Sequence, residues 1–313
     1  MKPMSRFVFS TFAAAAAIGV LSASSPAWAV PMLGPDLTTF TVLGASTVTN
    51  VPPSSIGGNV GVWSSGGANA ITGFLSSPGV AFPDPQVIGG LVHAGTTTGF
   101  PNAKSAQDQL SIAIANLGSL GAGSLLPADL VGLTIFPGVY TVPAGTTNLS
   151  GAVTLDGQGN ANAAWVFQMP STLITSPNSR VNVTNTGSGA GLYWNVGSSA
   201  TIDLNTAFMG NILALASITM NTNATDLCGR ALAKNGAVTL DHNRLSRICT
   251  GFLAGSGGLS GGLDVTTTPG GFTTVDFRPP APVKGGGTVP EPASLAMLGL
   301  GLAGLGFVRR RRS

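Results

Sequence analysis

Short runs in which apolar and polar residues alternate recur through the middle of the chain, and they restrict its fold more than any other feature. Alternation with a period of two is typical of a β-strand that buries one face. Glycine and asparagine separate the runs and helical periodicity is almost absent, so stacked parallel coils of a solenoid explain the pattern better than antiparallel hairpins. The runs are Gly151–Asp156, Ser199–Leu204, Ala216–Asn221 and Gly236–Asp241, and their apolar anchors Val153, Ile174, Ile202, Ile218 and Val238 stand 16 to 28 residues apart.

This register places the short polar side chains of each run on the outside of the coil. Where Ile218 and Met220 point inward, Ser217, Thr219 and Asn221 must point outward. Threonine offers one methyl and one hydroxyl on a stiff side chain, and many of them at regular spacing can match an ordered lattice of water with little entropy loss. The alternative is an ordinary solvated sheet, because strand faces tolerate threonine and serine well. By the same register, Thr154, Thr201 and Thr239 also lie outside.

The N-terminal residues have the pattern of an export signal. Lys2 and Arg6 precede an apolar run over residues 7–21, and Ala27-Trp28-Ala29 has the small residues that signal peptidase reads. We therefore predict that residues 1–29 are a signal peptide cleaved after Ala29. A membrane-spanning helix is the less favoured alternative because the apolar run is short.

The C-terminal residues 289–313 have the pattern of a membrane anchor. Sixteen uncharged residues, 293–308, follow Pro290-Glu291-Pro292 and precede Arg309, Arg310, Arg311 and Arg312. Sixteen helical residues reach about 24 Å, whereas a bilayer core is about 30 Å thick, so we expect a transient inner-membrane anchor with a positive cytoplasmic end. This ending resembles the PEP-CTERM sorting signal of Gram-negative bacteria. The resemblance implies that an exosortase recognises the segment and that the protein reaches the cell surface or the extracellular matrix.

Charge and catalytic side chains are scarce between the two ends. Between residues 30 and 288, eight basic residues face ten aspartates, a net charge of 8 − 10 = −2, and glutamate is absent. Without a basic stripe, nucleic acid is not expected as a partner. The region has two histidines, His93 and His242, 149 residues apart, and the strand-end aspartates Asp156, Asp203 and Asp241 suit turn hydrogen bonding. The sequence thus predicts no enzyme activity, no catalytic residue and no metal site.

Two cysteines, Cys228 and Cys249, lie 21 residues apart, which is about one coil. Residues one coil apart in a solenoid sit about 4.8 Å apart, within the Cα separation of 4.4 to 6.8 Å that a disulfide allows. We predict a disulfide in this exported chain, with two buried unpaired thiols as the alternative.

One helix and one tether are expected outside the coils. Asn102 can cap a helix over Ala103–Leu117, whose apolar residues recur every three or four positions, and Gly118 can end it. We expect this helix to pack along the side of the coil. Residues 251–288 are rich in glycine and proline and predict a tether, in which Leu263–Phe277 either adds a strand or stays extended.

From about Thr38 to Asn243 the sequence resembles the ice-binding-like proteins of bacteria and fungi. The resemblance implies a discontinuous right-handed β-solenoid of triangular cross-section, one long helix beside it, no cofactor, and ice-facing motifs similar to Thr-(Ala/Gly)-x-(Thr/Asn). Imperfect copies of that motif begin at Ser176, Thr206 and Thr222. The matching segments are FTVLGASTVTN, GNVGVW, GLTIFPGVYTV, LSGAVTLDGQGNANAAWVFQMPSTLIT, YWNVGSSATI and FMGNILALASITMNTNATDLCGRALAKNGAVTLDHN.

We therefore expect residues 30–250 to form a mainly β, parallel solenoid domain that binds ice and inhibits ice recrystallisation at the cell surface or outside the cell. A structural or adhesive protein of an exopolysaccharide matrix is the alternative. The predicted ice-binding residues are Ser176, Ser179, Thr154, Thr206, Thr219, Thr222, Thr225 and Thr239.

Overall fold

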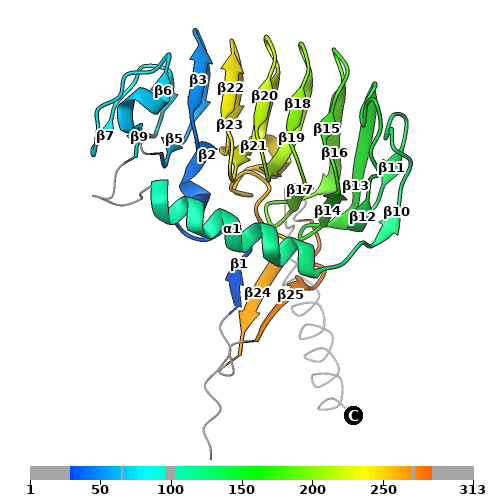
Figure 1. Ribbon diagram of the computed structural model, residues 1–313. Helices are drawn as coiled ribbons and strands as arrows, with labels where there is room; N and C mark the ends of the chain where they lie inside the picture. The colour runs from blue at the N-terminus through cyan, green and yellow to red at the C-terminus, as the bar shows by residue number, and fades with distance from the viewer. Residues whose placement is uncertain (1–28, 65, 96–102, 269–271, 284–313) are drawn as a thin grey trace, which may run out of the picture.

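The structure is a computed structural model that describes residues 29–64, 66–95, 103–268 and 272–283. Its main body is a solenoid with three rows of strands, and each coil passes through the first row, the second and then the third (Figure 1). All strand pairs within these rows are parallel except the one made by the terminal strand β7. The parallel β-solenoid predicted from the alternating runs is confirmed.

The rows define three faces of the solenoid, and the long strands β19 and β21 turn a corner and contribute to two of them. The first face contains β11 (Thr134–Ile135), β13 (Ala152–Asn160), β16 (Arg180–Thr186), the starts of β19 (Ala207–Ala214) and β21 (Thr225–Ala233), β23 (Arg244–Ser246), β4 (Ser55–Gly57) and β8 (Val87–Ile88). The second face contains β10 (Ser124–Leu125), β12 (Gly138–Thr141), β14 (Ala164–Met169), β17 (Gly191–Val196), the ends of β19 and β21, β2 (Phe40–Gly44), β5 (Asn59–Val62), β9 (Val92–Ala94) and β7 (Ala81–Phe82). The third face contains β15 (Leu173–Ile174), β18 (Ala200–Ile202), β20 (Ile218–Met220), β22 (Val238–Asp241), β3 (Val48–Val51) and β6 (Ile71–Thr72).

The solenoid is discontinuous along the chain. The early strands β2, β3 and β4 stack on β21, β22 and β23, so that Val48 lies beside Val238 although 190 residues separate them in sequence. An open coil end leaves strand edges free to aggregate, and the N-terminal strands cover that end of the last coil. The discontinuity implied by the family resemblance is thereby confirmed.

The helix α1 (Ala103–Ser119) runs along the outer side of the second face, between the end of the solenoid with β9 and the end with β10 (Figure 1). Its buried stripe, which includes Leu110 and Leu117, packs against outward residues of that face such as Tyr193 and Leu213. The helix ends two residues beyond the predicted Leu117, because Gly118 stays helical and Gly121 takes the left-handed conformation at φ 76°. The predicted cap Asn102 lies outside the described residues.

Aromatic rings fill part of the solenoid interior. Phe167 and Trp194, on adjacent coils, stack with ring centroids 4.2 Å apart, and Phe208 continues the column. The buried indole of Trp194 donates to the carbonyl of Met209 at 3.0 Å, and that of Trp165 to a carbonyl of the preceding coil at 3.1 Å. The rings therefore bury their area without leaving an indole N–H unpaired.

The expected tether does not begin at residue 251, because the glycine-rich segment packs against the solenoid. Leu253 and Leu259 are buried in the main core, following the short 3-10 helix η3 (Gly251–Leu253). Strands β24 (Leu263–Thr267) and β25 (Thr273–Phe277) then pair antiparallel with each other, and β24 pairs with β1 (Ala29–Pro31). Four leucines and valines among the glycines, at positions 253, 259, 263 and 265, bury enough apolar surface to fix the segment.

All buried apolar residues of the described chain lie between Met32 and Val265, so residues 30–288 contain its entire described core. Among the described residues no helix is long and apolar enough to cross a membrane. The predicted signal peptide, apart from Ala29, and the predicted anchor at 289–313 lie outside the described residues.

Candidate functional site

The third face carries an unbroken row of threonines on its outer side. Thr201 lies beside Thr219, Thr219 beside Thr239, Thr239 beside Thr49, and Thr49 beside Thr72. We call these five residues the threonine ladder. Adjacent strands lie about 4.8 Å apart, so the five positions repeat at that step over about 19 Å.

The ladder is rigid because the residues that alternate with it are fully buried. Ile218 and Met220 flank Thr219 on β20, and Val238 and Leu240 flank Thr239 on β22, all with no exposed surface. Thr219 itself is half-buried between its neighbours. A strand with one side locked in the core fixes the direction of its outward side chains. Each threonine therefore holds its methyl and hydroxyl at a defined place on the surface.

A second row of small residues runs beside the ladder, two positions earlier in each strand, and includes Ser199, Ser217, Ala237 and Thr47. Ser217 accepts a hydrogen bond from the backbone N–H of Ala237 at 3.1 Å, and Ser199 accepts one from that of Ser217 at 3.3 Å. These hydroxyls tie each coil to the next. The two rows together form a surface of short side chains without charge.

Charged groups lie at the edges of this surface: Lys234 lies where the coil arrives from the second face, and Asp203 and Asp241 lie where it turns toward the first face. Asn221 donates to Asp203 at 2.8 Å, and Asp241 accepts from Thr222 and contacts His242 at 2.5 Å. The hydrogen bond from Thr222 is the largest cause of a lowered pKa at Asp241. Asp241 therefore stays ionised and engaged with its neighbours at neutral pH.

The corner itself is built from left-handed residues that repeat from coil to coil. Their backbone N–H groups donate to carbonyls of the next coil at 2.8 to 3.1 Å. Asparagine accepts a positive φ more readily than other side chains do. The corner residues are Asn178, Asn205, Asn223 and His242, with φ between 53° and 62°.

For two residues the prediction of ice binding is wrong, because this corner buries their side chains. Thr206 is fully buried and donates to the carbonyl of Ser176 at 3.1 Å, and Ser179 is 1 % exposed and donates to the same carbonyl at 2.6 Å. Their hydroxyls satisfy backbone groups inside the bend. They brace the corner and do not reach the surface.

The other predicted residues are divided among three places. Thr219 and Thr239 lie in the ladder, whereas Ser176 lies after β15, where the coil turns toward the first face. Thr222 lies at the corner, and Thr154 and Thr225 lie on the outer side of the first face. The predicted ice-binding set left out Thr201, which the register had placed outside, and also Thr49 and Thr72. An apolar residue followed by threonine, as in Val48-Thr49 and Ile71-Thr72, repeats the pattern of Ile218-Thr219 and is the signal that could have found the last two.

The outer side of the first face differs from this surface in charge and shape. It carries exposed Arg180 and Arg244 in one row, with the large side chains of Met209 and Leu227 close by. A hollow of about 330 Å³ separates part of it from the segment that follows Cys249. The second face is covered by α1, so the third face is the flat and uncharged one in the described part of the chain.

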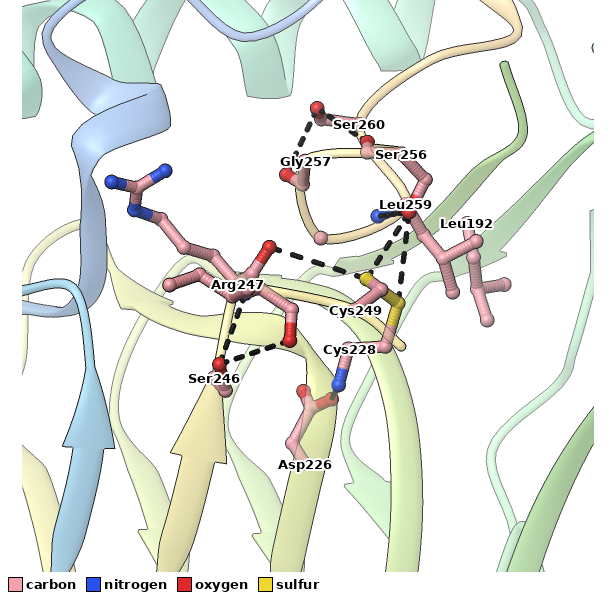
Figure 2. The surroundings of a disulfide bond; sticks show 12 residues. Leu192, Asp226, Cys228, Ser246, Arg247, Cys249, Ser256, Gly257, Leu259 and Ser260 are labelled. Atoms are coloured by element: carbon pink, nitrogen blue, oxygen red, sulfur yellow. Dashed lines mark hydrogen bonds between the residues drawn. A yellow bond between two sulfur atoms is a disulfide. The ribbon is translucent and has the colours of Figure 1, made fainter. Parts of the chain in front are cut away.

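The predicted disulfide between Cys228 and Cys249 is confirmed, with a Cα separation of 4.8 Å (Figure 2). Ser256 of the glycine-rich segment donates to the sulfur of Cys249 at 3.1 Å. Nearby, Asp226 is fully buried and accepts from the N–H of Cys228 at 3.4 Å, and burial raises its pKa to about 8. This cluster joins the last coils to the segment that follows them.

The buried Arg230 holds the same segment in place. Its guanidinium donates to the carbonyls of Gly257 at 2.8 Å and Thr38 at 2.7 Å, and to the side chain of Asn211 at 2.7 Å. The arginine thus links three distant parts of the chain, and burial lowers its pKa to about 10. Its role is structural.

The two histidines lie apart and do not form a catalytic pair. His93 is 3 % exposed, and its ring packs edge-on against Phe40 with centroids 5.1 Å apart. Burial lowers its pKa to about 4, so the ring is neutral. Within the described residues no group of three or more histidine, cysteine or acidic side chains is placed to hold a metal ion.

Comparison with known proteins identifies two matching families. Residues 42–246 match a family described as ice-binding-like, and residues 288–312 match the PEP-CTERM protein-sorting motif. An ice-binding protein of Nostoc sp. (strain HG1) is 38% identical over 306 residues, which cover 97% of this chain and 91% of that protein. One from Flammulina populicola is 30% identical and covers 70% of this chain and 90% of its own length. The crystal structure of an ice-binding protein from the Antarctic ascomycete Antarctomyces psychrotrophicus has a TM-score of 0.60 at 32% identity, covering 70% of this chain and 99% of that one.

Proposed function

The chain belongs to the ice-binding-like family, and from that premise we propose that it binds ice through the threonine ladder of its third face. The observation that carries the proposal is the register of five threonines on five successive strands. Such a row repeats one methyl and one hydroxyl at a constant step, which a crystalline surface of water can match and a disordered solvent cannot.

A rigid surface of short side chains makes adsorption to ice favourable in free energy. A single hydroxyl contact with water contributes little, because it replaces an equal contact with the solvent. The ladder is already fixed by its buried neighbours, so contact with ice orders few additional side chains. The methyl groups and the small residues of the adjacent row leave room for water to be held in a lattice-like arrangement between hydroxyls. Many weak contacts then add up over the whole face.

Adsorption of this kind makes and breaks no covalent bond, and we infer that the protein is not an enzyme. The proposed activity is inhibition of ice growth and recrystallisation. Bound molecules would force the ice front to curve between them. The expected partner is the ice surface itself, and no cofactor takes part.

The sorting motif supports export to the cell surface or beyond. We propose that signal peptidase removes residues 1–29 and that residues 289–313 hold the chain briefly in the inner membrane of a Gram-negative bacterium. An exosortase would recognise Pro290-Glu291-Pro292 and act there.

Ice-affinity partition of residues 30–288 tests the function. A slowly growing ice hemisphere should incorporate the wild-type domain and exclude serum albumin. Thr239→Tyr places a bulky ring on the ladder and should return the domain to the level of albumin. Thr225→Tyr makes the same change on the first face and should leave incorporation intact. Exclusion of the wild-type domain would refute ice binding, and loss through Thr225→Tyr alone would refute this surface.

A further inference from the structure

The last described residues, Arg278 to Val283, cross one particular corner of the solenoid. The N–H of Val283 donates to the carbonyl of Gly159 at 3.2 Å, and the N–H of Ala161 donates to that of Ala281 at 2.6 Å. The side chain of Asn162 donates to the carbonyl of Pro279 at 2.8 Å. We call residues 278–283 the strap.

The strap crosses the corner between the first and second faces. Gly159 and Ala161 lie where the chain passes from β13 on the first face to β14 on the second. In a coil with three sides, the corner shared by two faces lies opposite the remaining face. The chain therefore leaves the solenoid on the side opposite the threonine ladder.

The N-terminal strand lies on the same side. β1 pairs with β24, and Figure 1 shows β1, β24 and β25 beyond α1, away from the row of third-face strands β6, β3, β22, β20, β18 and β15. Arg278 holds the start of the strap through a salt bridge of 2.6 Å to Asp264 of β24. Neither described end of the chain approaches the ladder.

The connection from the strap to the sorting motif is short. The motif match begins at residue 288, so four residues, 284–287, separate it from Val283. From Val283 to residue 288 the backbone makes five residue steps, which span at most about 18 Å even when fully extended. The connection therefore holds the corner opposite the ladder close to whatever retains the C-terminal end.

From this arrangement we propose a further function, which rests on the proposed ice binding: the protein binds ice while its C-terminal end is still held. The partner on one side is ice, and on the other it is the surface to which the C-terminal end is attached. A molecule held in this way presents its whole ladder outward. The protein thereby attaches the surface that bears it to ice, in addition to acting as a free inhibitor.

Attachment of the domain to beads at defined points tests this proposal. A cysteine added after Gly287, in place of the sorting segment, attaches residues 30–287 through the natural exit point. Thr219→Cys attaches the domain through the ladder, and Ile112→Cys, on the exposed side of α1, attaches it through the covered second face. Ile112 is 59 % exposed. Because Cys228 and Cys249 are buried and paired, a biotin maleimide reacts at the introduced thiol.

Fluorescent streptavidin beads with equal amounts of each protein are then exposed to growing ice. Beads attached through residue 287 or residue 112 should be captured, and beads attached through residue 219 should remain at the level of bare beads. Background capture through residue 287, while the same protein without beads still enters ice, would overturn the proposal. If the free protein itself stays out of ice, the proposed function fails and this proposal fails with it, so the two failures are distinguishable.

Discussion

The buried side chains of Asp226 and His93 should make the free energy of unfolding depend on pH over some ranges and not over others. The substitution Asp226→Asn should change that pH profile. Burial raises the pKa of Asp226 from 3.8 to about 8, and burial lowers the pKa of His93 from 6.5 to about 4. In the unfolded chain both groups return to their ordinary values. Between pH 4 and 8, folding therefore takes up a proton at Asp226, and between pH 4 and 6.5 it releases one at His93.

The direction follows from which state binds more protons. The raised pKa of Asp226 makes stability fall as pH rises, and the lowered pKa of His93 makes stability rise over its own window. From pH 4 to 6.5 the two slopes cancel. From pH 6.5 to 8 only Asp226 contributes, and 8 − 6.5 = 1.5 pH units at about 1.36 kcal/mol each lower the free energy of unfolding by about 2 kcal/mol.

Urea unfolding of residues 30–288 at several pH values, followed by tryptophan fluorescence, measures this profile. Wild-type stability should be level up to pH 6.5 and then fall. Asp226→Asn removes the falling slope, so its stability should rise by about 3 kcal/mol from pH 4 to 6.5 and then stay level. His93→Gln should show the opposite behaviour, with a continuous fall from pH 4 to 8. An Asp226→Asn profile of the same shape as the wild type would refute the reasoning.

Two further predictions concern the connections between coils. Replacing both Cys228 and Cys249 by Ser should lower the free energy of unfolding by about 3 kcal/mol, because the bridge closes a sequence separation of 21 residues, and urea titration would contradict this if the midpoint stayed unchanged. Thr206→Val should cost about 1 kcal/mol of stability by removing the buried hydrogen bonds of the Thr206 hydroxyl with the carbonyl of Ser176 and the hydroxyl of Thr175, yet the folded variant should enter ice as the wild type does. Reduced incorporation of fully folded Thr206→Val would show that the residue acts at the surface after all.

Local alternation was sufficient to predict the middle of the fold. The register of Ile218, Thr219 and Met220 follows from a period of two, and the spacing of Cys228 and Cys249 follows from the length of a coil. Both are short-range properties. A sequence reading recovers them because each strand buries the same face that its own pattern marks as apolar.

The stacking of the early strands on the last coil has no local signal, so the pairs Val48-Thr49 and Ile71-Thr72 indicate outward threonines without showing that these extend the row of Thr219 and Thr239. Thr206 and Ser179 were misplaced for a different reason. Serine and threonine occur in similar local sequences inside a tight corner and on an open face. Whether such a side chain is buried depends on the backbone groups of the bend that it can bond to. In the tail, glycine content suggested a tether, whereas Leu253 and Leu259 determined the packing.

The most direct measurement of the central claim is the contact between ice and individual threonines. Solid-state NMR of a frozen sample labelled at threonine can follow the transfer of proton magnetisation from ice to each side chain. Thr49, Thr201, Thr219 and Thr239 should receive it first, ahead of Thr154 and Thr225 on the first face. Earlier transfer to Thr154 and Thr225, or equal transfer to both faces, would contradict the assignment of the threonine ladder as the ice-binding surface.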